Sequence, residues 1–457
     1  MSVVPIRKSG NTTDIPVTTA TEQRKWLRFV TAASLFDGHD AAINIMRRIL
    51  QASGAEVIHL AHNRSVQDIV EAAVQEDVDA IAISSYQGGH IEYFKYLIDR
   101  LRELGAGHIK VFGGGGGVII PAEIQELHDY GVTRIYSPAD GQSIGLQGMI
   151  QDMLQRCSSG EQRPPSPELR TLAEGDRLVL TRIITALENN QYKDKDLEQL
   201  SKLAQAAATT PVLGITGTGG SGKSSSTDEI IRRFRQDSDD ALRIAVLAID
   251  PTRKKTGGAL LGDRIRMNAI GHSNIFMRSI ATRDASVEIP QRLAEIIQAI
   301  KVSGFDLIII ETPGIGQGDA GIVPYVDTSL YVMTPEFGAA SQLEKIDMLD
   351  YADVFAINKF DRKGSEDALR DVSKQVQRNR EAFSQLPEEM PVFGTIASRF
   401  NDDGITALYQ ALLVELQRHG LASFHHNLQR VTTRVSSQRS LIIPPQQQRY
   451  LAEIAET

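Results

Sequence analysis

A glycine-rich run that ends in a lysine and a serine is the most specific chemical signal in the sequence. Residues 217–224 read GTGGSGKS and fit G-x-x-x-x-G-K-[ST]. In such a loop the backbone N–H groups surround phosphate oxygens, while Lys223 neutralises the β- and γ-phosphates and the Ser224 hydroxyl ligates Mg²⁺. A turn without a ligand would need neither the lysine nor the hydroxyl. The expected phosphate contacts are Gly217, Gly219, Gly220, Ser221, Gly222, Lys223, Ser224 and Ser225.

Two later motifs follow in the order that a GTP-binding domain requires. Residues 311–314 read ETPG after an apolar stretch, so Gly314 can donate its backbone N–H to a γ-phosphate. Residues 358–361 read NKFD and match N-K-x-D, whose last carboxylate can accept two hydrogen bonds from guanine but not from adenine. The predicted nucleotides are therefore GTP and GDP. The expected base contacts are Asn358, Lys359, Asp361, Ala397 and Ser398.

Two aspartates fall near the same predicted edge as the glycine-rich loop. Asp250 follows an apolar stretch at residues 244–249, and Asp263 stands in the GDR sequence of residues 262–264. Mg²⁺ prefers a few carboxylates together with a serine hydroxyl and phosphate oxygens, so both are candidate ligands. For either aspartate alone, a helix cap or a turn is the alternative interpretation.

A histidine close to two aspartates stands on a predicted strand-to-helix loop. His39 can present one imidazole nitrogen to a metal while Asp37 holds the other, although a capping or solvated loop is the alternative. Ser84 and Ser85 follow a later strand, and five glycines at residues 113–117 follow the next. Loops at the carboxyl ends of parallel strands meet at one edge, which suits a long, flat, partly polar ligand.

The elements that position these residues alternate between strand and helix patterns, and they form two series. The first has apolar strands at residues 26–33, 56–60, 80–83, 109–112 and 133–136. The second has strands at residues 212–216, 244–249, 307–310, 329–333 and 354–357. This alternation predicts an α/β protein with two doubly wound domains, one flavodoxin-like and one a P-loop domain, joined by a helical linker.

The division of the chain follows from these series and from a Ser- and Pro-rich stretch at residues 158–170. The expected parts are a polar tail at residues 1–24, a first domain at 25–156, a linker with a helical connector at 157–208, a second domain at 209–420 and a connector at 421–457.

Composition narrows the classes of partner. The formal net charge of −8 over 457 residues leaves no basic surface of the kind that binds nucleic acid. The single cysteine, Cys157, permits no internal disulfide, which favours a reducing, cytoplasmic location. The sequence has no run of 18 apolar residues and no signal-peptide pattern, so we expect no membrane association.

The motifs of the second domain resemble those of the GTPase chaperones that serve methylmalonyl-CoA mutase, a metallochaperone-like class of P-loop GTPases. The resemblance rests on residues 217–224, 248–251, 256–264, 311–317 and 358–361. It implies that Lys223, Asp263 and Glu311 take part in GTP hydrolysis. It also implies a Mg²⁺ environment of Ser224, the Ile249 carbonyl, Asp250, Asp263 and Glu311, a nucleotide contact from Arg266, and a further switch segment at residues 336–347 that includes Lys345.

The first domain resembles the cobalamin-binding domain of adenosylcobalamin-dependent mutases, whose pattern is D-x-H-x-x-G, then S-x-L, then G-G. Asp37-Gly38-His39 fits, while Ala42 and Tyr86 replace a glycine and the leucine. The resemblance implies that His39 coordinates cobalt after displacing dimethylbenzimidazole and that Asp37 polarises it. Residues implied to contact the displaced tail or line its channel are Ser84, Ser85, Gly116 and Gly117.

The order of the two domains resembles the N-terminal part of the fused isobutyryl-CoA mutases. It implies adenosylcobalamin-dependent interconversion of isobutyryl-CoA and n-butyryl-CoA, with a GTPase domain that gates cofactor loading and protection. The acyl-CoA would bind only through a mutase barrel, and a barrel of about 250 residues does not fit in the rest of this sequence. The resemblance also implies that the full-length form is a homodimer and that an adenosyltransferase delivers the cofactor. A cobalamin-binding GTPase regulator of a separate mutase and a cobalamin sensor are the alternatives.

Overall fold

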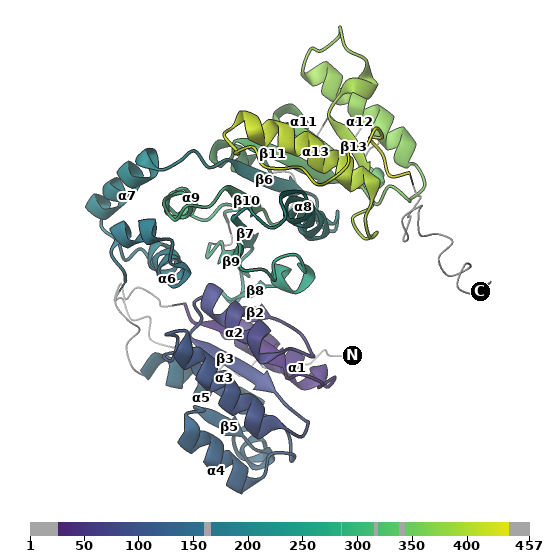
Figure 1. Cartoon of the computed structure of the whole chain (residues 1–457). Helices are drawn as coiled ribbons and strands as arrows, with labels where there is room; N and C mark the ends of the chain where they lie inside the picture. Colours follow the sequence, from purple (N-terminus) through teal and green to yellow (C-terminus); the bar gives the residue numbers. More distant parts are fainter. Residues whose placement is uncertain are drawn as a thin grey trace, which may run out of the picture.

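The chain folds into two lobes, each built around one parallel β-sheet (Figure 1). The computed structural model describes residues 26–159, 166–284, 286–314, 319–337, 343–344 and 346–437. Within these residues no helix is long and apolar enough to span a membrane.

The first lobe contains the first predicted series. Its strands are β1 (Arg28–Ala33), β2 (Glu56–His59), β3 (Ala80–Ser84), β4 (Lys110–Gly114) and β5 (Arg134–Tyr136). Its helices are α1 (Asp40–Ala52), α2 (Val66–Gln75), α3 (His90–Glu103), α4 (Pro121–Tyr130) and α5 (Pro138–Ser159). These five strands have the order β5-β4-β3-β1-β2, which is the order of a flavodoxin-like sheet and confirms the predicted fold.

The second lobe contains a seven-stranded sheet in the order β13-β12-β11-β6-β10-β7-β9. Its strands are β6 (Val212–Gly217), β7 (Ile244–Asp250), β9 (Ile275–Ala281), β10 (Leu307–Glu311), β11 (Thr328–Met333), β12 (Val354–Asn358) and β13 (Val392–Thr395). The principal helices are α8 (Lys223–Ser238), α9 (Leu293–Val302), α12 (Ser365–Asn379) and α13 (Asp403–Arg418). All residues of β6 and β10 are buried, because helices cover a parallel sheet on both faces.

Two strands of this sheet, β9 and β13, were not predicted from the sequence. The edge strand β9 has Arg278 at its centre, and a fully buried arginine within an apolar run hides the strand pattern. The other, β13, is only four residues long. Both occupy the sheet's edges, so the five predicted strands form its uninterrupted centre.

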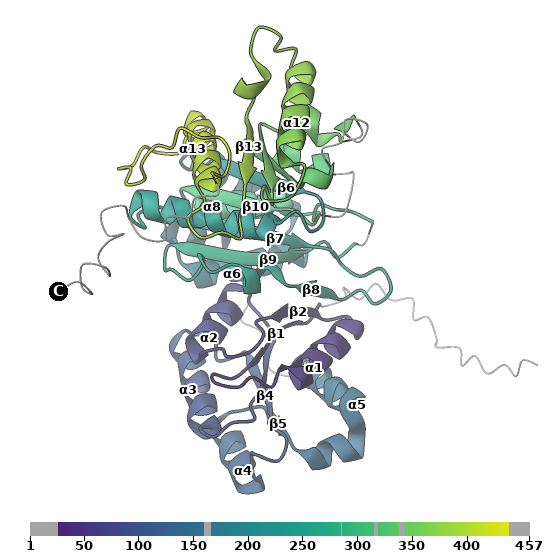
Figure 2. The same ribbon diagram turned by 90° about the vertical axis from the view of Figure 1, so that its right-hand side faces the viewer.

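The first sheet has six strands rather than the five that the sequence predicted. The sixth is β8 (Ala259–Leu261), which comes from the second series and pairs with β2 in the register Glu56↔Ala259 to Ile58↔Leu261. Figure 2 shows β8 between β2 of one lobe and β9 of the other. Because β2 would otherwise expose a row of unpaired backbone groups, the pairing protects an edge. The two lobes are therefore joined through a shared strand as well as through the linker.

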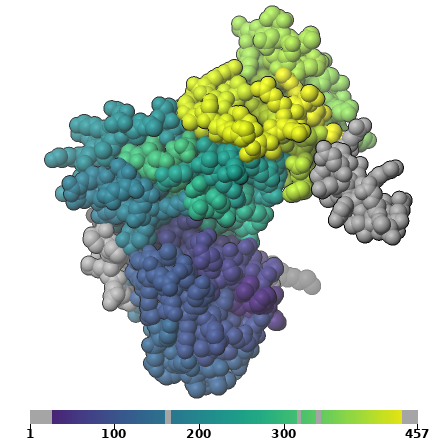
Figure 3. All heavy atoms as spheres, viewed as in Figure 1, coloured from purple at the N-terminus to yellow at the C-terminus, as the bar shows by residue number. Residues whose placement is uncertain are grey.

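The predicted helical connector is confirmed as α6 (Arg177–Glu188) and α7 (Asp194–Ala206). Its apolar residues, among them Leu180, Ile183 and Leu200, share one core with β7 and α9. In the space-filling view the connector lies against the second lobe, and the two lobes meet over a broad area (Figure 3). The connector is thus part of the second lobe's core.

Candidate nucleotide and cofactor sites

The glycine-rich loop joins β6 to the N-terminus of α8, as the motif predicts. The Nζ atom of Lys223 donates hydrogen bonds to the carbonyl oxygens of Gly217 at 2.8 Å and Thr218 at 3.1 Å. Gly220 and Gly222 have φ values of +75° and +92°, a backbone conformation that residues with a Cβ adopt only with strain. The loop is thus closed around the lysine in the shape that presents backbone N–H groups to an anion.

Gly314 lies against this loop, in the place that the ETPG motif predicts. A Cβ atom on Gly314 would overlap Lys223 Nζ and would come within 2.8 Å of Gly219 N. A side chain at this position would therefore push the lysine out of the loop. The backbone of the predicted γ-phosphate sensor is adjacent to the predicted phosphate site.

The predicted Mg²⁺ ligands meet at the start of α8. Ser224 Oγ donates to Glu311 Oε1 at 2.7 Å and lies 3.2 Å from Asp263 Oδ1. Thr227, which sequence reasoning missed, donates to Glu311 Oε2 at 2.9 Å. The signal for Thr227 is its position three residues after Ser224, on the same face of the helix.

Burial and mutual repulsion disfavour the charged forms of the carboxylates in this cluster. Burial, followed by the charge of Asp263, raises the pKa of Glu311 to about 7. Burial, with the charges of Asp263 and Glu311, also raises the pKa of Asp250 well above its ordinary value. The Oδ2 atom of Asp250 is buried and has no hydrogen-bond partner among the residues that the structure describes. A hard dication would satisfy these oxygens, so the residues fit Mg²⁺.

Protein carboxylates alone do not complete a metal site here. Among the residues that the structure describes, no three His, Cys, Asp or Glu side chains converge on one metal position. Mg²⁺ in nucleotide sites usually has one or two carboxylates, waters and phosphate oxygens as ligands. Ile249 directly precedes Asp250 in β7, and the Arg266 side chain is 66% exposed with Nη1 3.8 Å from Asp263 Oδ1.

The base-recognition motif is tied to the phosphate loop. Asn358 Nδ2 donates to the Ser221 carbonyl at 2.8 Å, and its Oδ1 accepts from the Ala397 N–H at 3.0 Å. Lys359 Nζ donates to the Gly220 carbonyl at 2.7 Å. The structure therefore brings together three motifs that the sequence predicted separately. Asp361 and Ser398, the other predicted base contacts, are exposed.

In the first lobe, Asp37 holds His39 as the sequence predicts. Asp37 Oδ1 lies 2.9 Å from His39 Nδ1 and also accepts from the His39 N–H, while Oδ2 accepts from the Tyr86 N–H at 2.7 Å. Asp37 is fully buried, whereas the His39 side chain is 74% exposed. The other imidazole nitrogen, Nε2, is thus left for a ligand outside the sheet.

A cavity of about 210 Å³ lies beside this loop, between α1 and the carboxyl ends of β3 and β4. Ser84 lines it, and within the described part of the chain the buried Ser84 Oγ atom has no hydrogen-bond partner. A Cβ on Gly115 would overlap the Ser85 carbonyl oxygen. An orphan hydroxyl beside bare backbone fits the partly polar tail of cobalamin. The glycines in its lining are Gly113, Gly114, Gly115 and Gly116.

Some predicted residues lie elsewhere. Ser85 Oγ accepts a hydrogen bond from Ser34 at 2.9 Å, and Ser85 is absent from the lining of the cavity. Gly117 is also absent from the lining, and a Cβ there would meet nothing within 4 Å. Two further residues line the cavity but were missed as site residues. Met153 lies on α5, a helix that was not predicted. Tyr136 ends β5, a strand that was predicted without a site residue. Lys345, in the predicted switch segment, lies outside the described residues.

The fold and the two sites define a class: a P-loop GTPase domain behind a flavodoxin-like domain with the loop architecture of a cobalamin site. The family model described as methylmalonyl Co-A mutase-associated GTPase MeaB matches residues 180–442, which is more than half of the chain. The chain therefore belongs to the MeaB family of mutase-associated GTPases. A second model, described as B12 binding domain, matches residues 27–140 and confirms the first lobe as a cobalamin-binding domain.

Longer proteins contain both domains. Proteins named fused isobutyryl-CoA mutase are similar to this chain in Cupriavidus metallidurans (66% identical over 431 residues), Nocardia farcinica (60% over 434) and Geobacillus kaustophilus (55% over 437). Each match covers 94% of this chain and 39%, 40% and 40% of the relative, respectively. The predicted resemblance to that group is confirmed, and the chain spans about two fifths of the length of these relatives.

Proposed function

We propose that this chain is the cobalamin-binding and GTP-hydrolysing part of an adenosylcobalamin-dependent acyl-CoA mutase that interconverts isobutyryl-CoA and n-butyryl-CoA. The observation that carries the proposal is the 66% identity to a fused isobutyryl-CoA mutase across 94% of the chain. In this view the GTPase domain gates the loading and protection of the cofactor.

The first lobe would hold the cofactor through a few residues. His39 presents Nε2 to cobalt while the buried Asp37 fixes the ring through Nδ1. Ser84 offers its orphan hydroxyl, and Gly115 keeps the cavity open for the displaced tail. When bound, adenosylcobalamin would supply the radical chemistry of carbon-skeleton rearrangement.

The second lobe would bind and hydrolyse GTP. Lys223 neutralises phosphate charge, and the Mg²⁺ environment is formed by Ser224, the Ile249 carbonyl, Asp250, Asp263 and Glu311. Gly314 lies next to Lys223, so its N–H can donate a hydrogen bond to the γ-phosphate and respond to its loss on hydrolysis. Asp361 provides guanine recognition, and Ala397 and Ser398 complete the base site.

The wider setting belongs to the same proposal. Acyl-CoA would bind to a mutase barrel outside this sequence, in a homodimeric full-length protein that receives its cofactor from an adenosyltransferase. The location would be cytoplasmic, supported by the single cysteine.

The test uses the 457-residue chain and separates the two activities. Lys223→Ala should abolish GTP hydrolysis, because phosphate charge is no longer neutralised during transfer, and should leave adenosylcobalamin binding intact. Lys195→Ala, an exposed lysine on α7, is the matched control and should hydrolyse GTP as the unmodified chain does. Phosphate release and an absorbance titration with adenosylcobalamin measure the two properties. Wild-type hydrolysis by Lys223→Ala, or an unmodified chain that binds no cobalamin, would contradict the proposal.

A further inference from the structure

The segment that leads into the Mg²⁺ environment is attached to the cobalamin-binding lobe. Its strand β8 is the sixth strand of that lobe's sheet, and the Ala259 N–H donates to the Ala55 carbonyl at 3.2 Å. A Cβ on Gly258 would overlap the Gln51 carbonyl oxygen, so the backbone is packed directly against the end of α1. The segment belongs to the second domain by sequence and to the first by structure.

Asp263 follows this strand closely. It lies two residues beyond Leu261, the last residue of β8, and its Oδ1 atom is 3.2 Å from Ser224 Oγ at the start of α8. Two residues span at most about 7 Å. The backbone between the first lobe's sheet and the Mg²⁺ environment is therefore too short to absorb much movement of either.

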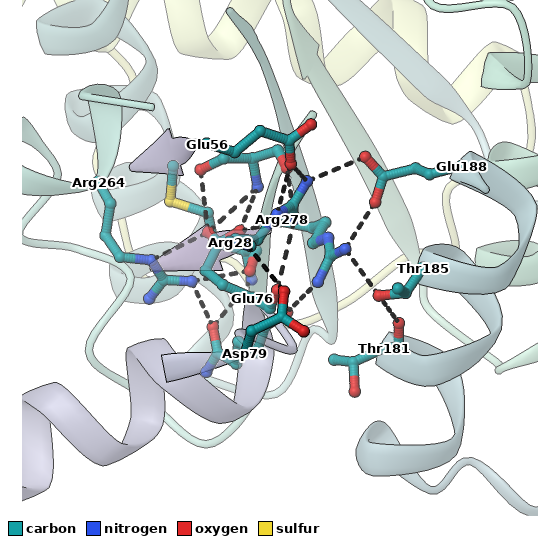
Figure 4. A network of polar contacts seen from close by, with 12 residues as sticks. Arg28, Glu56, Glu76, Asp79, Thr181, Thr185, Glu188, Arg264 and Arg278 are labelled. Carbon is teal, nitrogen blue, oxygen red and sulfur yellow. Dashed lines mark hydrogen bonds and ion pairs between the residues drawn. The ribbon is translucent and has the colours of Figure 1, made fainter. Parts of the chain in front are cut away.

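Arg264, the residue that follows Asp263 in the sequence, is held by a polar network that includes Glu76 of the first lobe (Figure 4). Its Nε donates to Glu76 Oε1 at 3.3 Å, while Nη2 donates to Gln75 Oε1 at 2.9 Å and to the Met277 carbonyl at 2.8 Å. The Arg264 side chain is 9% exposed and that of Glu76 is fully buried. Removal of either partner would leave a charge away from water, so the pair holds its geometry firmly.

The Glu76 carboxylate, besides pairing with Arg264, also holds β9 in place, and this structural role must be distinguished from its contact with Arg264. Glu76 accepts from the Ser279 N–H at 3.0 Å and from Ser279 Oγ at 2.9 Å, and Arg278 pairs with Glu188 at 2.6 Å in the same buried network. These contacts fasten β9 to α2 and α6. Arg278 therefore shares the burial of Arg264 but does not adjoin a predicted Mg²⁺ ligand.

We propose that Arg264, held by Glu76 of the cobalamin-binding lobe, is a positioning residue for Asp263, so that the first lobe sets the geometry of a Mg²⁺ ligand in the GTP site. This inference rests on the proposed role of Asp263 at Mg²⁺. Because coupling free energies are reciprocal, Mg²⁺ with nucleotide should in turn stabilise the junction of β2, β8 and α2.

The experiment compares Arg264→Gln with Arg278→Gln in the 457-residue chain. A fluorescent GDP analogue is bound, and the Mg²⁺ concentration that gives half-maximal retention is measured, together with the thermal midpoint of unfolding. Arg264→Gln should raise the required Mg²⁺ concentration by about 10–100-fold, the usual effect of losing a residue that orients a metal ligand. Arg278→Gln should lower the midpoint without changing the Mg²⁺ requirement. Glu76→Gln, a change confined to the first lobe, should raise the required Mg²⁺ concentration as Arg264→Gln does.

Equal Mg²⁺ requirements in Arg264→Gln, Arg278→Gln and the unmodified chain would overturn the positioning role alone. An unmodified chain that retains GDP equally well in EDTA would overturn both this role and the proposed Mg²⁺ environment. Because loss of a buried partner can prevent folding, a second measurement uses the unmodified chain. Hydrogen exchange in β2 and β8 should slow when Mg²⁺ is added to the GDP complex, and unchanged exchange would overturn the proposal.

Discussion

The Nδ1 atom of His39 lies 2.9 Å from Oδ1 of Asp37, although the histidine side chain is 74% exposed and the aspartate is fully buried. The same carboxylate accepts the Tyr86 N–H from the loop after β3. Asp37 therefore links two loops at the carboxyl edge of the sheet and fixes the orientation of the ring. This arrangement fits a histidine whose Nδ1 atom is fixed by a carboxylate while its Nε2 atom binds a metal.

Asp37→Asn tests this arrangement. Replacing a carboxylate oxygen by an NH₂ group weakens the restraint on the ring, and cobalamin binding should fall about 10–100-fold. His39→Ala should also abolish the histidine nitrogen coupling in the EPR spectrum of the cob(II)alamin form. Asp129→Asn, on α4, is the matched control and should bind normally. Undiminished affinity in Asp37→Asn would disprove the role of the carboxylate.

The glycine run offers a second test with an internal control. A Cβ on Gly115 would overlap the Ser85 carbonyl oxygen, whereas one on Gly117 would meet nothing within 4 Å. Gly115→Ala should therefore distort the cavity, lower the thermal midpoint and weaken cobalamin binding by at least tenfold, a free-energy change of about 1.4 kcal/mol. Gly117→Ala should change neither property. Equal binding by the two variants would contradict the proposed place of the cobalamin tail.

Sequence motifs predicted the phosphate and base loops because each depends on residue types at fixed spacing after a buried strand. Residues 217–224 and 358–361 lie in separate parts of the chain, yet the order of parallel strands brings them to one edge, where Asn358 contacts Ser221. Once the fold class is known, the site follows, since the carboxyl ends of neighbouring strands converge.

The junction of the lobes could not be predicted in the same way. Strand β8 is three residues long, and nothing local shows that its partner, β2, lies some 200 residues earlier in the chain. Arg28 is the first residue of β1, yet it is buried against Glu56 of the neighbouring strand β2 and Glu188 of α6, which lies 160 residues later in the chain. Pairings of this kind are decided by tertiary packing.

Asp361 should determine the choice of base. Its carboxylate can accept from both N1 and the amino group of guanine, and Asp361→Asn replaces one acceptor by a donor. The variant should bind GTP at least tenfold more weakly and should favour xanthosine triphosphate. Competition against a fluorescent nucleotide measures both affinities. If ATP displaces the probe from the unmodified chain as effectively as GTP does, the prediction of guanine specificity is wrong.

The buried ion pairs at the junction should make the protein sensitive to acid. Burial alone would raise the pKa of Glu56, but the charges of Arg28 and Arg283 outweigh it and lower that pKa from 4.5 to about 2. A depressed pKa contributes stability that is present above 4.5 and lost as the pH falls towards 2, here on the order of 3 kcal/mol. Denaturant unfolding between pH 6 and pH 2, at roughly half-unit steps, measures this loss.

Glu56→Gln separates this effect from general acid unfolding. The variant removes one of the buried carboxylates that pair with Arg28 and Arg283 and leaves them Glu188, so it should lose stability at neutral pH and show a shallower decline below pH 4.5. Glu126→Gln, in an exposed pair with Lys95, should retain the pH profile of the unmodified chain. Identical acid profiles for Glu56→Gln and the unmodified chain would show that Glu56 does not titrate at the junction.

The last prediction is that the 457-residue chain binds adenosylcobalamin and hydrolyses GTP but does not isomerise isobutyryl-CoA by itself. The rearrangement requires the thioester above the cofactor and the exclusion of water. In the described structure, however, the His39 side chain is 74% exposed, and the second sheet's carboxyl edge holds the nucleotide motifs. Gas chromatography of hydrolysed products, after incubation with both cofactor and GTP, should detect no n-butyrate. Appreciable conversion without an added mutase barrel would show that these two lobes can hold the acyl-CoA themselves.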